Sequence, residues 1–278
     1  MNVLEFDLTV ALVSLVAGLL GALTGLGGGV VIVPVLALLF GVDMRYAIGA
    51  SLISVIATSS GAASAYVKEG YTNLRIGMFL EIATTFGALF GAFLAAKIST
   101  SAVAIVFGVV LVWSAYLSSR PRRELSDGTH SERLAQWLEL DSSYPSRQGP
   151  HPYHVHAVPY GFSMMFVAGT LSGLLGIGSG AVKVVAMDEV MRVPFKVSTT
   201  TSNFMIGVTA AASAGVYLNR GYIDPVLSTP VMLGVLAGSL WGTRWLVQAP
   251  TAWLRHLFAL VIFVLAVEMI YCGATGRI

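Results

Sequence analysis

The chain has 278 residues, of which 56% are hydrophobic and 11% charged, and its formal net charge is +2. Soluble domains carry about 25% charged residues, so this composition and a mean hydropathy of +0.79 exclude an ordinary soluble protein and indicate an integral membrane protein. The small, scattered positive charge gives no reason to expect a nucleic-acid partner, and the single cysteine, Cys272, excludes a disulfide framework.

Eight apolar segments follow one another along the chain, and the lipid bilayer is their expected environment. Between the fourth and the fifth lies a polar stretch, 118–157, which contains five arginines and a short amphipathic piece near 132–140. We interpret this stretch as a linker; its histidines lack a cysteine or acidic pair, and we expect no metal there. The apolar segments are 8–40, 47–67, 76–96, 101–117, 158–191, 196–218, 226–247 and 252–272.

Glycines interrupt the first and the fifth apolar segments, at 25–29 and at 176–180. Irregular backbone at membrane depth exposes N–H groups that hydrocarbon cannot satisfy, so such breaks must line a protein cavity. Glycine lets the backbone approach a ligand, and the helix that restarts after each break directs a partial positive charge at the gap. The two breaks therefore indicate an anion site, with helix packing alone as the alternative.

The two halves of the chain are copies of each other. A shift of 151 residues, from 25 to 176, aligns the two glycine stretches and continues without a gap. Across 25–71 it leaves 12 of 47 positions identical, where this composition gives roughly 8% by chance. Internal repeats are common in secondary transporters, whose substrate site lies between them. We therefore expect an N-terminal repeat, 1–117, and a C-terminal repeat, 158–278.

The distribution of basic residues favours an inverted arrangement of the repeats. If every segment is a simple span, the two sides of the membrane carry 9 and 6 basic residues; if the first and fifth are re-entrant hairpins, they carry 11 and 4. Positive charge gathers on the cytoplasmic side, so we predict an all-α membrane fold in which each repeat is a broken, re-entrant helical hairpin followed by three transmembrane helices. Both termini then face outside and the linker faces the cytoplasm.

Polar residues near the breaks complete the predicted site. Lys183 lies three residues after the second break, and a lysine in an apolar membrane segment indicates function; the alternatives are that it reaches the membrane surface or pairs with Asp188 or Glu189. The polar run 198–203 opens the next span, where hydroxyl and amide donors suit either an oxyanion or interhelical bonding. The predicted substrate-binding residues are Gly27, Gly28, Gly29, Ser51, Gly178, Ser179, Gly180, Lys183, Ser202 and Asn203.

Other residues of the spans have simpler interpretations. Glycines at four-residue spacing, Gly87 with Gly91 and the run Gly234, Gly238 and Gly242, predict close helix packing. Two intramembrane carboxylates, Glu81 and Glu268, are candidates for carrying a coupled proton, and pairing with a neighbouring helix is the alternative. The chain has no nucleophile–base set at membrane depth, and no Ser or Thr follows Lys183 as in a P-loop, so we expect neither an enzyme nor a cofactor.

With these motifs the chain resembles the TauE/SafE family of membrane permeases, the sulfite and organosulfonate exporters. The resemblance covers about residues 8–95 and 158–245. It implies export of sulfite, sulfoacetate or a related small anion. Ser179 and Lys183 replace Gly28 and Ile32 of the first copy, which leaves the anion open. The matching motifs are Gly-Leu-Gly-Gly-Gly at 25–29, Val33-Pro34, Ala50-Ser51-Leu52, the glycine motif at 176–180, and Thr201-Ser202-Asn203-Phe204-Met205.

We therefore expect a multi-pass secondary transporter in the inner membrane of a bacterial cell. It would export a small anion that the glycine breaks of both repeats hold at mid-membrane. An anion channel or a non-transporting membrane scaffold is the alternative. A homodimer is an arrangement that the sequence leaves open, because an apolar exterior looks the same whether it faces lipid or a second copy.

Overall fold

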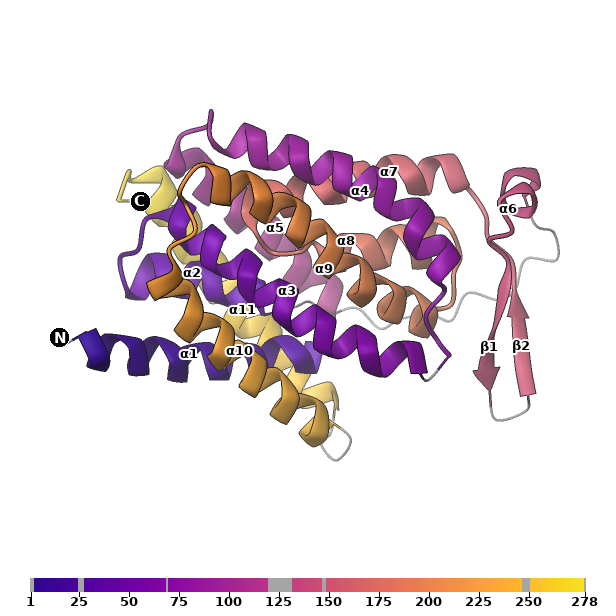
Figure 1. Cartoon of the computed structure of the whole chain (residues 1–278), viewed down its shortest axis with the longest axis horizontal. Coiled ribbons are helices and arrows are strands. Elements are labelled where there is room, and N and C mark those ends of the chain that lie inside the picture. Colours follow the sequence, from indigo (N-terminus) through magenta and orange to yellow (C-terminus); the bar gives the residue numbers. More distant parts are fainter. Residues whose placement is uncertain are drawn as a thin grey trace.

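The structure, a computed structural model, describes residues 3–24, 28–68, 70–119, 132–146, 149–246 and 251–277. Within these ranges the chain is mostly helical, as expected, with one short antiparallel sheet (Figure 1). The elements are α1 (Val3–Thr24), α2 (Gly29–Leu39), α3 (Met44–Lys68), α4 (Leu74–Ala95), α5 (Thr100–Ser119), α6 (Arg133–Trp137), β1 (Ser142–Ser146), β2 (Gly149–Tyr153), α7 (Val158–Leu175), α8 (Gly180–Val185), the π-helical turn η1 (Ala186–Val190), α9 (Phe195–Asn219), α10 (Pro225–Leu246) and α11 (Thr251–Ala274).

Each glycine-interrupted segment folds back on itself. Phe6, near the start of α1, packs edge-on against Phe40, which follows α2, with ring centroids 5.6 Å apart. In the second segment the His156 N–H, before α7, donates a 3.1 Å hydrogen bond to the Met191 carbonyl, after η1. Both segments therefore return to the end of the molecule from which they start, which is the geometry of a helical hairpin.

Helix bounds recur along the chain at the interval of 151 residues. α3 covers 44–68 and α9 covers 195–219, while α4 covers 74–95 and α10 covers 225–246. The helical segment that follows each glycine break shows the same interval: α2 covers 29–39, and α8 together with η1 covers 180–190.

Glycines bring two pairs of helices into backbone contact. A side chain at Gly87 on α4 would collide with the Phe166 carbonyl on α7, and one at Gly238 on α10 would collide with the Leu15 carbonyl on α1. Gly87 and Gly238 are 151 residues apart, as are Leu15 and Phe166. The packing role predicted for these two glycines therefore fits the structure, and both interfaces join a helix of the first half to one of the second.

α3 and α9 pack against each other in opposite directions. Arg45, at the start of α3, donates a 3.1 Å hydrogen bond to the Tyr222 hydroxyl, just after α9. Beyond the other end of α3, the Asn73 N–H donates to the Thr201 hydroxyl, near the start of α9, at 3.1 Å. Both chain termini lie at one end of the molecule, and α6 with the β-hairpin lies at the opposite end (Figure 1).

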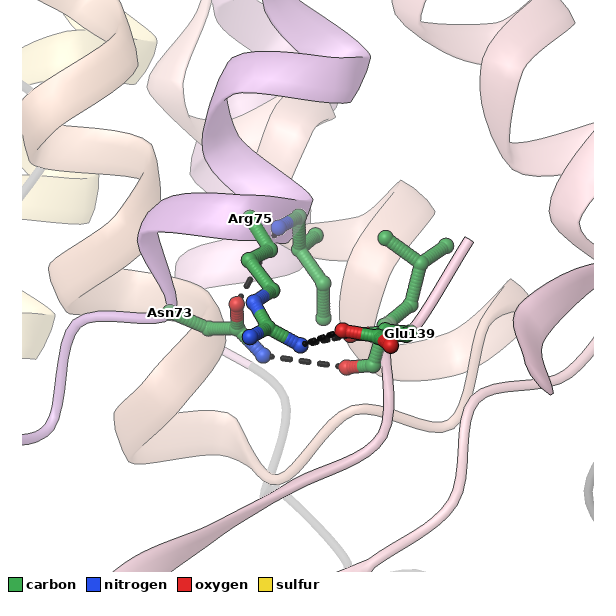
Figure 2. Close-up of polar contacts among 5 residues, drawn as sticks. Asn73, Arg75 and Glu139 are labelled. Atoms are coloured by element: carbon green, nitrogen blue, oxygen red, sulfur yellow. Dashed lines mark hydrogen bonds and ion pairs between the residues drawn. The ribbon is translucent and has the colours of Figure 1, made fainter. Parts of the chain in front are cut away.

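The stretch between α5 and α7 contains more structure than its composition predicts. Its amphipathic piece forms α6, as expected, but the chain then forms the β1–β2 hairpin, which departs from the all-helical prediction. Asn73, which caps α4 through a bond from the Ile76 N–H, holds this region by donating to the Leu140 carbonyl at 3.1 Å and to the Tyr153 hydroxyl at 2.7 Å. Arg75 adds an exposed 2.7 Å ion pair with Glu139 (Figure 2).

The outer faces of the helices are apolar. On α4, Met78 and Phe86 expose 67% and 65% of their surface, a pattern suited to contact with lipid. Among the described residues, α4 and α7 meet the length and hydropathy expected of a membrane span, and the apolar parts of α2, α5, α10 and α11 are shorter.

Candidate functional site

The second glycine break is a buried turn between α7 and α8. Gly176 ends α7 with φ +68°, and Gly178 and Ser179 follow with φ +73° and +48°, which reverses the chain. A serine in the left-handed region is uncommon and is often associated with function. The Ser179 side chain is only 3% exposed, and its hydroxyl has no hydrogen-bond partner within the described structure. A polar side chain and the N–H groups of the first turn of α8 thus meet at this break.

The first break lies partly outside the described residues, since Gly27 belongs to 25–27. Gly28 and Gly29 are buried at the start of α2. A Cβ at Gly28 would lie 2.8 Å from the Val235 side chain, whereas one at Gly29 would lie 2.6 Å from the Ser51 hydroxyl and 2.9 Å from the Gly176 carbonyl oxygen. Gly29 therefore faces the other break directly.

Ser51 joins α3 to the second break by a hydrogen bond. Its fully buried hydroxyl, on α3, donates to the Gly176 carbonyl at 2.8 Å. Ser202, its mate in the second half, donates from α9 to the Gly180 carbonyl at 3.4 Å. The Asn203 side chain is half-buried, and of that pair it is the Ser202 hydroxyl that contacts a break.

Lys183 is completely buried and does not reach the surface. Its ammonium group donates to the Thr209 hydroxyl at 2.5 Å. The single proton of that hydroxyl faces two acceptors, Oε1 of Glu81 at 2.7 Å and the Met205 carbonyl at 2.8 Å. The acid that this hydrogen-bond chain joins to Lys183 is Glu81 on α4. Of the two neighbours in sequence expected as alternatives, Glu189 is exposed and Asp188 half-buried.

Sequence reasoning identified Glu81 and Lys183 separately and missed that they meet. Thr209 links them through its hydroxyl. Neither charge recurs in the other half: the position aligned with Glu81 is Met232, and the position aligned with Lys183 is Ile32. Two opposite charges in apolar segments, each without a charged residue at the aligned position of the other half, were the available signal, since a buried charge requires a partner.

Comparisons with known proteins identify the family of the chain. The family model described as sulfite exporter TauE/SafE matches residues 10–269. The probable membrane transporter protein YunE of Bacillus subtilis (strain 168) is 27% identical over 267 residues, which cover 93% of this chain and 95% of YunE. The probable membrane transporter protein MJ0441 of Methanocaldococcus jannaschii is 23% identical over 261 residues, covering 87% and 88%. No solved structure is significantly similar to the chain.

These relatives are named as transporters and not as enzymes, and the family model spans nearly the whole chain. The protein is embedded in the membrane, and it belongs to the TauE/SafE family of membrane transporters.

Proposed function

We propose that the protein is a multi-pass secondary transporter of the bacterial inner membrane that exports a small anion, such as sulfite or an organosulfonate. Residues 1–117 and 158–278 are its two inverted repeats, and 118–157 form the cytoplasmic linker. The anion binds between the two glycine breaks, and access to it alternates between the two sides of the membrane.

The antiparallel packing of α3 and α9 supports the inverted arrangement. Equivalent helices of two repeats run in opposite directions when the repeats are inverted in the membrane. The hairpin arrangement assigns four basic residues to the outside: Arg45, Lys97, Arg220 and Arg277. The charges agree, because the first three gather at the end where α3 begins: Arg45 contacts Tyr222, and Lys97 and Arg220 both lie over the Phe93 ring. α6 and the β-hairpin, both parts of the linker, lie at the other end (Figure 1).

The observation that carries the anion proposal is the buried hydroxyl of Ser179, which has no hydrogen-bond partner among the described residues and lies one helical turn before the buried Lys183. A sulfonate or sulfite oxygen at the break would accept a hydrogen bond from this hydroxyl and from the first N–H groups of α8. The Lys183 ammonium supplies a full positive charge, which a single helix terminus, worth about half a charge, does not.

Flux into proteoliposomes tests the proposal. Purified protein should take up sulfite and sulfoacetate with saturable kinetics, whereas a channel or a scaffold gives flux that does not saturate or no flux above empty vesicles. Lys183→Met should raise the half-saturating concentration at least tenfold, because the anion loses its counter-charge in a site that excludes water.

The matched control is Lys97→Met, which removes a lysine that is exposed at the end of α4. It should leave the half-saturating concentration unchanged. Equal half-saturation in the Lys183 and Lys97 variants would contradict the assignment of Lys183 to the anion site.

A further inference from the structure

Glu81 is held in an incomplete network at the interface of the two halves. Its side chain is 8% exposed, and Oε1 accepts hydrogen bonds from Thr209 at 2.7 Å and from Thr85 at 3.3 Å. The second carboxylate oxygen, Oε2, is buried and has no hydrogen-bond partner among the described residues. An unmade bond at a buried carboxylate is costly, so this oxygen is a ready acceptor for a proton.

The corresponding place in the other half shows that packing alone does not require these charges. Subtracting 151 from 183 and 209 gives Ile32 and Thr58, and adding 151 to 81 gives Met232. Ile32 is buried, and Thr58 bonds only to carbonyls of its own helix. One half therefore has apolar residues at the two aligned positions, while the other keeps an acid and a base there at a substantial cost of desolvation.

Few other ionisable groups lie on the elements packed around Glu81. α8 contributes Lys183, which reaches Glu81 through the Thr209 hydroxyl of α9. The ionisable residues of α9 are Lys196, which is exposed near its start, and Tyr217, which donates to the Gly173 and Leu174 carbonyls. α7 carries only Tyr160, which is exposed at its beginning, and η1 carries Asp188 and Glu189. Lys183 is thus the one cation of the described structure whose hydrogen-bond chain reaches Glu81.

We propose that Glu81 is the proton-binding residue that couples anion transport to proton transport; this rests on the anion site proposed above. Without an anion, Lys183 and ionised Glu81 compensate each other through Thr209, and the site is neutral. When a monoanion takes Lys183 as its counter-charge, the Glu81 carboxylate loses its compensation and binds one proton from the same side of the membrane. The occupied site, with ammonium, anion and carboxylic acid, is neutral again. Anion and proton therefore cross together, one to one, because either alone would leave a net charge in a medium of low dielectric.

The test uses proteoliposomes that contain a pH-sensitive dye, with the membrane voltage clamped by potassium and valinomycin. Methanesulfonate and ethanesulfonate are added outside, because each is a monoanion whose sulfonate stays ionised and cannot itself carry the proton. Wild-type protein should acidify the lumen by about one proton for each anion taken up. Glu81→Gln should still exchange internal for external anion, but its acidification should fall at least tenfold.

Two further variants keep the test decisive. Glu268→Gln changes the other intramembrane carboxylate, which is exposed on α11, and should acidify like the wild type. The double variant Lys183→Ile with Glu81→Met copies the interface of Ile32 and Met232; it should fold, elute as a single species, and neither bind anion nor move protons.

Each outcome has one meaning. Anion flux without acidification in the wild type, or an unchanged proton-to-anion ratio in Glu81→Gln, overturns the coupling role and leaves the proposed function standing. No saturable flux of these anions or of sulfite overturns the proposed function, and this inference with it.

Discussion

The Ser51 hydroxyl on α3 donates a 2.8 Å hydrogen bond to the carbonyl of Gly176, in the break that follows α7. The bond joins residues 125 positions apart and brings the first half of the chain onto the glycine turn of the second. Gly29, at the start of α2, lies against the same two groups. The position of the two breaks relative to each other thus depends on a hydroxyl and on a missing side chain.

Gly29→Ala should therefore impair transport more than it impairs folding. The added methyl group would lie 2.6 Å from the Ser51 hydroxyl and 2.9 Å from the Gly176 carbonyl oxygen, so one of these groups must move. A displacement of about 1 Å in a binding site commonly costs about a hundredfold in rate, and we expect a loss of at least tenfold in anion flux. Gly215→Ala is the control, since nothing lies within 4 Å of its new Cβ; flux of Gly29→Ala equal to that of Gly215→Ala would contradict this prediction.

Gly87→Ala and Gly238→Ala should destabilise the protein by similar amounts. Each methyl group would collide with a backbone carbonyl of the facing helix, which cannot move like a side-chain end. Overpacking of this kind costs typically about 1–3 kcal/mol. Thermal unfolding in detergent, followed by circular dichroism, should show lower midpoints for both, while Gly215→Ala should match or exceed the wild type, because alanine favours the helix. If neither variant lowered the unfolding midpoint, the facing helices could move apart to accept the methyl group without loss of stability, and the prediction would be wrong.

Asn73→Ala should destabilise the attachment of the linker more than Glu139→Gln. Asn73 is 8% exposed, caps α4 and donates to both Leu140 and Tyr153, so its loss removes a cap and leaves buried acceptors unpaired, at about 2–3 kcal/mol. Arg75 and Glu139 are 64% and 72% exposed, and such an ion pair is worth about 1 kcal/mol or less. Thermal unfolding with and without added salt checks both: only the effect of Glu139→Gln should shrink with salt.

Tyr153 should make stability decline at alkaline pH. Burial raises the pKa of this hydroxyl above its ordinary value of 10.0, although the hydrogen bond from Asn73 opposes the shift. Because the folded state binds the proton more tightly, this contribution is complete below the unfolded value and is lost as the pH rises through the folded one. Unfolding midpoints measured across this range should fall less in Tyr153→Phe than in the wild type. Tyr144→Phe, at a half-buried tyrosine of the neighbouring strand, should retain the full decline.

Much of the helical pattern follows from hydropathy alone. The predicted apolar segment 47–67 corresponds to α3 at 44–68, and 226–247 corresponds to α10 at 225–246. The glycines at 176–180 correctly marked the end of α7 and the start of α8, because glycine is the residue that most readily accepts positive φ.

The β-hairpin and the Glu81–Lys183 network did not follow from the sequence, for different reasons. The two strands contain three prolines, Pro145, Pro150 and Pro152. Proline cannot donate a backbone hydrogen bond and is confined to edge strands, so the sequence argues against a strand here. Lys183 had acidic neighbours close in sequence, whereas its partner lies on a helix of the other half, 102 residues away by subtraction of 81 from 183. Only the packing between halves brings them together.

The glycine contacts of α4 with α7 and of α1 with α10 have a mechanical consequence. In each pair the backbone of a helix from one half contacts the backbone of a helix from the other. A rigid-body rotation of one whole half relative to the other would therefore break both of these close-packed interfaces. The rigid units are instead the pairs α1 with α10 and α4 with α7, each of which combines one helix from each half. Any change between outward and inward states should slide these units past each other along the seam of α3 and α9.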